Sequence, residues 1–127
     1  MSVNKVILIG NVGRDPNIRY VDVDRAVATF TLATTEPPYT LANGTRVAER
    51  TDWHNIVVWG NLAKIVEQYV RKGNKLYIEG SIHSRTYEDK TGYRKIITEI
   101  WAEKIEFCSV SMRNNNNGVN ENSSLQQ

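Results

Sequence analysis

Cysteine is almost absent from the chain: its 127 residues include one, Cys108, so no disulfide can form within a single copy. Such usage fits a reducing compartment, and we expect a cytoplasmic protein. Long apolar runs are also lacking. The run from Val6 to Ile9 is too short to span a membrane, and no small-residue cleavage site of a signal peptide follows it.

An excess of charge of one sign is lacking too. Sixteen Lys and Arg residues against 14 Asp and Glu residues give a net charge of +2, which excludes wholesale attraction to a polyanion. Any such partner must be bound by locally placed cations. The hydrophobic fraction of 40% is ordinary for a globular protein, and the length fits one domain that buries a core without metals or disulfides.

Groupings typical of catalysis are scarce. Neither histidine, His54 or His83, has a Cys, His or carboxylate partner at metal-ligand spacing, and no Ser or Cys has the context of a nucleophile. Gly10 to Gly13 follows a strand-like run as a dinucleotide-binding loop would, but the third glycine is missing and Asp15-Pro16 blocks the helix that should follow. We therefore expect no enzyme activity, no metal and no cofactor.

The composition changes near Ser111. Residues 114–127 are rich in Asn, Ser and Gln, and Val119 and Leu125 are their only aliphatic residues, too few to offset the entropy of ordering. We predict one domain over residues 1–110 and a disordered tail over residues 111–127.

Apolar alternation predicts mostly β-structure. Phe30 and Leu32 alternate with threonines, and Leu76, Ile78 and Ile82 are expected to point inward from a later strand. The predicted strands are residues 3–9, 26–35, 52–59, 75–87 and 93–107. Polar loops at 37–45 and 88–92 are expected to join pairs of strands as hairpin arms.

One segment has the period of a helix. Asn61 is a candidate N-cap and Gly73 a candidate C-cap. The apolar stripe comprises Leu62, Ile65, Val66 and Tyr69. Three strands, a short helix and two strands are the order of an OB-fold, so we predict an all-β, five-stranded Greek-key OB-fold barrel with one short helix and extended hairpin arms.

Large aromatic residues are placed unusually. Trp53 and Trp59 share one strand parity, opposite to the core-like Ile56 and Val58, and Tyr87 shares the outward parity of a later strand with Arg85. Outward aromatics among cations favour binding to single-stranded nucleic acid, because every base offers a face for stacking. The alternative is that these rings pack, either in the core or in a subunit interface. We assign Trp101 to packing of this kind.

Several segments, in order and at family spacing over residues 1 to about 107, resemble the bacterial and mitochondrial single-stranded DNA-binding proteins. They are Val3–Asn11 with Asp15-Pro16, Phe30–Thr34, Thr51–His54, Trp59–Ala63, Tyr69–Gly73 and Tyr77–Gly80. The resemblance implies an OB-fold homotetramer, nucleoid-associated, that wraps and protects single-stranded DNA in replication, recombination and repair.

The resemblance also implies roles for individual residues. The DNA-binding set comprises Trp53, Trp59, Tyr87, Tyr39, Lys5, Arg19, Arg71, Lys72 and Arg85. The subunit-interface set comprises His54, Asn4, Val6, Leu8 and Tyr77. Both parities of the run from Lys5 to Ile9 are apolar, which favours a strand covered on two faces, either by a second subunit or by the helix.

The sequence departs from the family in some places. Asn55, Asn61 and His83 stand where relatives often carry Lys or Arg, which implies weaker binding or a flatter salt dependence. The acidic tip that recruits replication and repair proteins in the family is absent, and the chain ends Ser123-Ser124-Leu125-Gln126-Gln127. A primosome-type OB-fold accessory protein and a structural oligomer with interface aromatics remain alternatives.

Overall fold

The computed structural model describes residues 1–108, so the predicted tail at 111–127 lies outside the described residues. All five predicted strands and the helix are present. The elements are β1 (Val6–Val12), β2 (Asn17–Asp22), β3 (Arg25–Glu36), β4 (Tyr39–Thr40), β5 (Arg46–Val47), β6 (Arg50–Trp59), α1 (Gly60–Tyr69), β7 (Lys75–Glu88) and β8 (Arg94–Phe107). The strand β2 was not predicted, and β4 and β5 are short strands within the first predicted loop.

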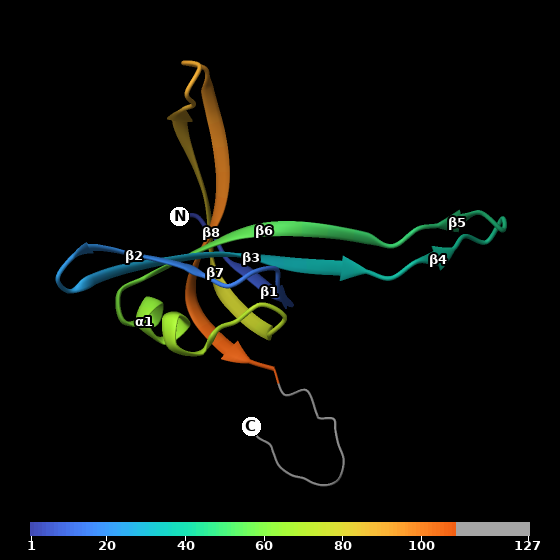
Figure 1. The fold of residues 1–127 in the computed structure, drawn as a ribbon. Coiled ribbons are helices and arrows are strands. Elements are labelled where there is room, and N and C mark those ends of the chain that lie inside the picture. The colour runs from blue at the N-terminus through green and yellow to red at the C-terminus, as the bar shows by residue number, and fades with distance from the viewer. Residues whose placement is uncertain (109–127) are drawn as a thin grey trace, which may run out of the picture.

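Six of the strands form one curled sheet in the order β1-β7-β8-β6-β3-β2, and β4 and β5 form a separate two-stranded sheet. Its start and end meet because β1 pairs with β7 along most of its length and then with β3 through Asn11 and Val12. The pairing of β6 with β8 is parallel, and the other ladders are antiparallel. This pattern of pairing gives the curved barrel with α1 against it that is seen in Figure 1.

The barrel interior is filled by the inward parity of the strands, as the alternation predicted. Leu32, Ile56, Val58, Leu76 and Ile78 have no exposed surface. Burial of this kind stabilises the fold by about 1.5–3 kcal/mol for each large aliphatic side chain. The opposite parity is therefore left to face outward along the same strands.

Helix α1 covers one side of this core with part of the predicted stripe: Leu62 and Val66 pack against the core, but Ile65 and Tyr69 do not. Ala63, Val66 and Val70 are fully buried, whereas Ile65 and Tyr69 are 47% and 62% exposed. The capping predictions were wrong: α1 begins at Gly60 after Trp59 without a side-chain cap, and it ends at Tyr69, with Val70 as the C-cap residue in extended conformation. Its last carbonyls instead accept hydrogen bonds from the Arg71 guanidinium.

Two hairpin arms extend from the barrel, as predicted. They point in different directions (Figure 1). The first continues β3 and β6 into β4 and β5, and the second is the outer part of β7 and β8. The second arm starts at Gly80, where the register shifts and where a Cβ would lie 2.0 Å from the Trp101 carbonyl oxygen. The inward assignment of Ile82 was wrong, because beyond Gly80 the strand has left the barrel and Ile82 is 46% exposed.

Candidate nucleic-acid interface

The register of the strands defines one continuous outer face. Asn17, Thr29 and Val57 lie in one row across β2, β3 and β6, and Trp101 and Ser81 continue that row across β8 and β7. Since side chains alternate along a strand, every second neighbour shares this face. The outer face thus comprises Asn17 and Arg19, Thr29 and Thr31, Trp53, Asn55, Val57 and Trp59, Glu99 and Trp101, and Ser81, His83, Arg85 and Tyr87.

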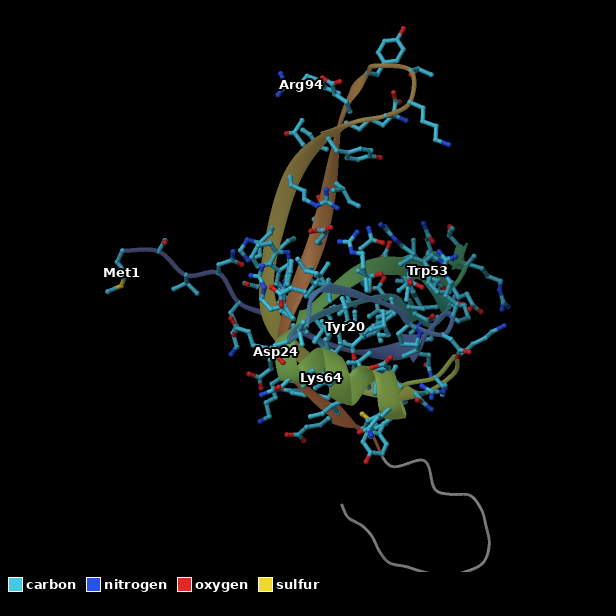
Figure 2. The ribbon with its side chains drawn as sticks, turned by 60° about the vertical axis from the view of Figure 1, so that its left-hand side comes forward. Met1, Tyr20, Asp24, Trp53, Lys64 and Arg94 are labelled. Atoms are coloured by element: carbon cyan, nitrogen blue, oxygen red, sulfur yellow. The ribbon has the colours of Figure 1, made fainter. Side chains whose placement is uncertain are left out.

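Figure 2 shows Trp53 on the side of the barrel away from α1, which carries Lys64, while the second arm rises to Arg94. The Trp53 side chain is 61% exposed. Its ring lies against the backbone of Gly13: a Cβ built on Gly13 would be 2.5 Å from Cζ3 of Trp53. The absence of a side chain at position 13 therefore allows this exposed ring its place.

Trp59 is 50% exposed and meets Trp101 edge-on, with ring centroids 6.2 Å apart and planes at 68°. Trp101 in turn stacks on His83, with centroids 3.8 Å apart and planes at 21°. The three rings come from β6, β8 and β7, so they cross the outer face from strand to strand. Trp101 packs against neighbouring rings, as we assigned it, but it does so on the outer face and not in the core.

A buried carboxylate lies beside these rings. Glu99 is 7% exposed and accepts hydrogen bonds from the Arg85 guanidinium at 3.1 Å and from the Trp101 indole N–H at 3.3 Å. The positive charge of Arg85, a predicted DNA contact, is thereby paired within the chain. Sequence reasoning missed Glu99, because its pairing with Arg85 follows from the hairpin register.

Next to the network lies a hollow of about 420 Å³ on the outer face. Its polar lining includes Thr29, Thr31 and Asn55, and Val57 is among its apolar residues. Arg14 and Arg85 also line it, together with the carboxylates of Asp15 and Glu99. The sequence offered a signal for the threonines, which alternate outward along β3, but none for Arg14, which lies in the β1–β2 connection.

The remaining predicted cations are dispersed. Arg19 lies on the outer face in register with Val27, which pairs with Trp59. Arg71 is engaged with helix carbonyls, and the Lys72 backbone N–H donates to Asp15 Oδ1 at 2.8 Å. Lys5 lies at the far edge of the sheet, where its ammonium is 2.8 Å from Glu79 Oε1. The structure therefore does not bring Lys5 to the predicted stacking residues Trp53, Trp59 and Tyr87.

Lys5 belongs instead to a small polar cluster with Glu79 and Tyr77, whose hydroxyl also donates to Glu79. The hydrogen bond from Lys5, and after it the one from Tyr77, lowers the pKa of Glu79. The same contacts with Glu79 raise the pKa of Lys5 and that of Tyr77. Glu79 and Tyr77 pair with Ile7 and Ile9 of β1, the edge strand to which we assigned a subunit interface.

The two alternating sets of side chains on β1 differ in burial. Val6 and Leu8 are half-buried and pack against the core of their own chain, whereas Ile7 and Ile9 are 57% and 52% exposed. Asn4 exchanges two hydrogen bonds with the backbone of Ile82. His54, also assigned to the interface, is partly buried and bonds to Thr34 Oγ1 at 2.8 Å.

The two arms carry the other aromatic candidates. Tyr39 in β4 is 57% exposed and Tyr87 in β7 is 42% exposed. At the tip of the second arm, Asp89 Oδ1 accepts hydrogen bonds from the backbone N–H groups of Thr91 and Tyr93 and from the Thr91 hydroxyl. The bond from the Thr91 hydroxyl is the largest cause of a lowered pKa at Asp89.

Among residues 1–108, no three His, Cys, Asp or Glu side chains are grouped to hold a metal ion. No helix within that range is long and apolar enough to cross a membrane.

A curled barrel sheet with a helix against its core is the architecture of the OB-fold proteins, and this chain adds two arms and an aromatic outer face to it. Residues 3–108 match the model of the single-strand binding protein family. The chain belongs to this family. Membership also confirms the prediction that it is not an enzyme, because the family is one of non-enzymatic proteins.

Individual relatives agree with this assignment. The chain is 55% identical over 126 residues to a single-stranded DNA-binding protein of Bacteroides thetaiotaomicron, covering 99% of this chain and 78% of that one. It is 46% identical to the single-stranded DNA-binding protein of Neisseria meningitidis, covering 93% of this chain and 66% of that one. The structure matches that of the Plasmodium falciparum SSB complex with ssDNA with a TM-score of 0.78 and 37% identity, over 86% of this chain and 97% of that one.

Proposed function

We propose that this protein binds and protects single-stranded DNA with little sequence preference, in replication, recombination and repair. One observation carries the proposal: along β6, Ile56 and Val58 are fully buried while Trp53 and Trp59 are 61% and 50% exposed. Exposing two tryptophans is costly for a chain that could bury them, and base stacking is the use that fits their place.

The outer face supports binding by stacking and by phosphate contacts together. Stacking of a base on an exposed ring contributes about 1–3 kcal/mol and tolerates any sequence. Arg14 and Arg19 form no ion pair within residues 1–108, so their charges are free to meet phosphates. Because phosphate contacts release counterions, we expect the affinity to fall as salt rises.

The residues proposed to contact DNA differ in how directly the geometry supports them. Trp53, Trp59 and Arg19 lie on the outer face itself. Tyr87 extends that face along the second arm, and Tyr39 lies in the first arm. Arg85 also lies on the outer face, but its charge is paired with Glu99. Arg71, Lys72 and Lys5 lie away from the outer aromatic residues and are the peripheral candidates for contact with DNA.

We further propose a homotetramer built on the edge strand β1. Within residues 1–108, β1 from Val6 to Gly10 pairs on one side only, with β7, and Ile7 and Ile9 are exposed there. An apolar strand with an open edge pairs readily with a second copy. The interface therefore rests on Ile7 and Ile9, beside the proposed Asn4, Tyr77 and His54, more than on the half-buried Val6 and Leu8.

The other expected properties follow from this role. The relative from Plasmodium falciparum is described in complex with ssDNA, and two bacterial relatives are named as single-stranded DNA-binding proteins. By likeness to them, we place this protein with the DNA of the cytoplasm and count replication and repair proteins as candidate partners. No cofactor is part of the proposal.

A competition assay tests this function. A fluorescently labelled oligonucleotide of deoxythymidine is bound first, and unlabelled competitors then displace it. We expect single strands of mixed sequence to compete nearly as well as oligo(dT), and duplex of the same length to compete poorly. Equal competition by duplex and single strand would contradict the proposal, since paired bases cannot reach the outward rings.

A further inference from the structure

His83 is held in a fixed place on the outer face. Its ring stacks on Trp101 with centroids 3.8 Å apart and planes at 21°, and its Nε2 lies 2.8 Å from the Ser81 hydroxyl. A hydroxyl can either donate or accept, so this bond can be kept whether Nε2 carries a proton or not. Both His83 and Trp101 are partly exposed. The pair thus presents a fixed imidazole on the face that carries Trp53 and Trp59.

Such an imidazole has two ways to contact a nucleic acid. In its neutral form it offers a flat face for a base. In its protonated form it also carries a positive charge, which can attract a phosphate. The contact made by this ring is therefore charged only while the imidazole carries a second proton.

Two charged side chains of opposite sign lie close to His83 in the strand register. Glu99 lies opposite it on β8, and Arg85 lies two residues away on β7. These two form an ion pair of 3.1 Å, so neither is free to compensate a charge on His83. Neutral side chains lie along the same stretch: Trp59 meets Trp101, Asn55 donates to the Thr98 carbonyl, and Asn4 bonds to the Ile82 backbone. A proton on His83 therefore adds one net positive charge to the outer face.

We propose that His83 is a contact for single-stranded DNA that strengthens as pH falls, and that Trp101 is the positioning residue that holds its ring. This inference rests on the proposed function. It gives the stack of His83 on Trp101 a role in binding, because the two rings lie outside the barrel core and are not needed to fill it. It also supplies a conditional cation at a position on the outer face where Arg85 is already paired.

The test measures poly(dT) affinity at about pH 8 and about pH 6 for the wild type and three variants. The wild type should gain affinity several-fold at the lower pH. His83→Gln should lose that gain, His83→Phe should keep stacking without the gain, and His83→Lys should bind well at both values. At the lower pH the slope of log affinity against log salt should be steeper in the wild type, by about 0.7 per protomer engaged.

Proton uptake provides a second readout that a structural role would not move. If DNA binds the protonated form more tightly, binding near neutral pH must take up protons. Calorimetry in buffers of different ionisation enthalpy should show this uptake in the wild type and its loss in His83→Gln. Trp101→Leu should shrink both the uptake and the gain, because the imidazole loses its support.

The outcomes separate this inference from the function on which it rests. If the wild type binds poly(dT) but His83→Gln shows the same gain and the same proton uptake, His83 is not the contact and the inference fails alone. An unchanged gain in Trp101→Leu would overturn the positioning role. If the wild type binds poly(dT) at neither pH, the proposed function itself fails.

Discussion

At the scale of single residues, the clearest feature is the contrast between neighbours on β6. Ile56 and Val58 have no exposed surface, while Trp53 and Trp59 on the alternate parity are at least half exposed. A strand that lines a barrel on one side permits this arrangement because its side chains alternate. The large rings are therefore available to a ligand and contribute little to the core.

Replacing Trp53 with Ala should weaken binding to oligo(dT) by about 1–3 kcal/mol for each base stacked on this ring. The free energy of unfolding should change by no more than roughly 0.5 kcal/mol, because the side chain is 61% exposed. Fluorescence anisotropy and urea denaturation measure the two effects.

Tyr69→Ala is a matched control, since Tyr69 is 62% exposed but lies on α1, away from the outer face. It should leave DNA affinity unchanged. A Trp53→Ala variant that unfolds readily would show Trp53 to be a structural residue and would contradict its role in stacking.

Gly13 has a residue-scale role through Trp53. Its substitution by Val places a Cβ where atoms of Trp53 and Thr31 now lie, at 2.5 and 2.7 Å. The exposed ring can move aside more easily than the strand, so we expect reduced oligo(dT) affinity and a shift in tryptophan emission, with the fold retained. Unaltered affinity would mean that the position of the Trp53 ring does not matter for binding.

At the scale of elements, the second arm is held by its strand ladder and by one carboxylate at its tip. The ladder of β7 and β8 runs from Leu76 to Glu88 along one strand and from Phe107 to Arg94 along the other. Asp89 then closes the turn by accepting hydrogen bonds from Thr91 and Tyr93. Because Tyr87 lies close to this turn, an ordered tip restricts the motion of the Tyr87 ring.

Asp89→Ala should raise the rate of amide hydrogen exchange at Thr91 and Tyr93 while leaving the barrel amides unchanged. The lowered pKa of Asp89 gives the same contacts a pH dependence. The stabilisation is fully present above the usual aspartate value of about 4 and is lost as pH falls through the lower value of the folded arm. Exchange rates at the tip that did not respond to the substitution would contradict this account.

The sequence predicted most elements because the barrel strands alternate strongly. It missed β2, where Ile18 is the one side chain packed against the core and the apolar signal is correspondingly weak. It also placed Ile65 and Tyr69 inward on α1, because a helical stripe read from apolarity alone cannot tell which side rests on the barrel. The inward prediction for Ile82 was wrong for a related reason: the arm leaves the barrel at Gly80, and that point depends on the strand register.

The candidate site was predictable in part. The parity of Trp53, Trp59 and Tyr87 followed from their spacing along strands. The contacts of Trp101 with His83, of Arg85 with Glu99 and of Gly13 with Trp53 join separate strands or a loop to a strand. Such pairs depend on register and loop path, which one sequence does not specify.

At the scale of the whole molecule, the exposed edge of β1 is the surface through which we propose that copies of the chain assemble. We expect light scattering of the wild type to give about four times the 14.5 kDa chain mass. Ile7→Lys should lower that mass while the circular dichroism spectrum stays native, because Ile7 is 57% exposed in the single chain.

Leu8→Ala distinguishes the two parities of the strand. Leu8 packs against the core of its own chain, and a fully buried Leu→Ala change costs about 2–5 kcal/mol of unfolding free energy. Because Leu8 is only half-buried, we expect a loss toward the lower end of that range. Its effect on assembly should be smaller than that of Ile7→Lys. A wild type that scatters as a single chain would refute the tetramer, and the barrel's outer face would then act alone.

The central claim is that exposed tryptophans stack on the bases of single-stranded DNA. Titrating the protein with poly(dT) while recording intrinsic tryptophan fluorescence tests it most directly, because stacking changes the emission of the rings themselves. We predict strong quenching that saturates and that weakens as the salt concentration rises. Saturable binding of poly(dT) without any change in tryptophan emission, or no binding, would contradict the account.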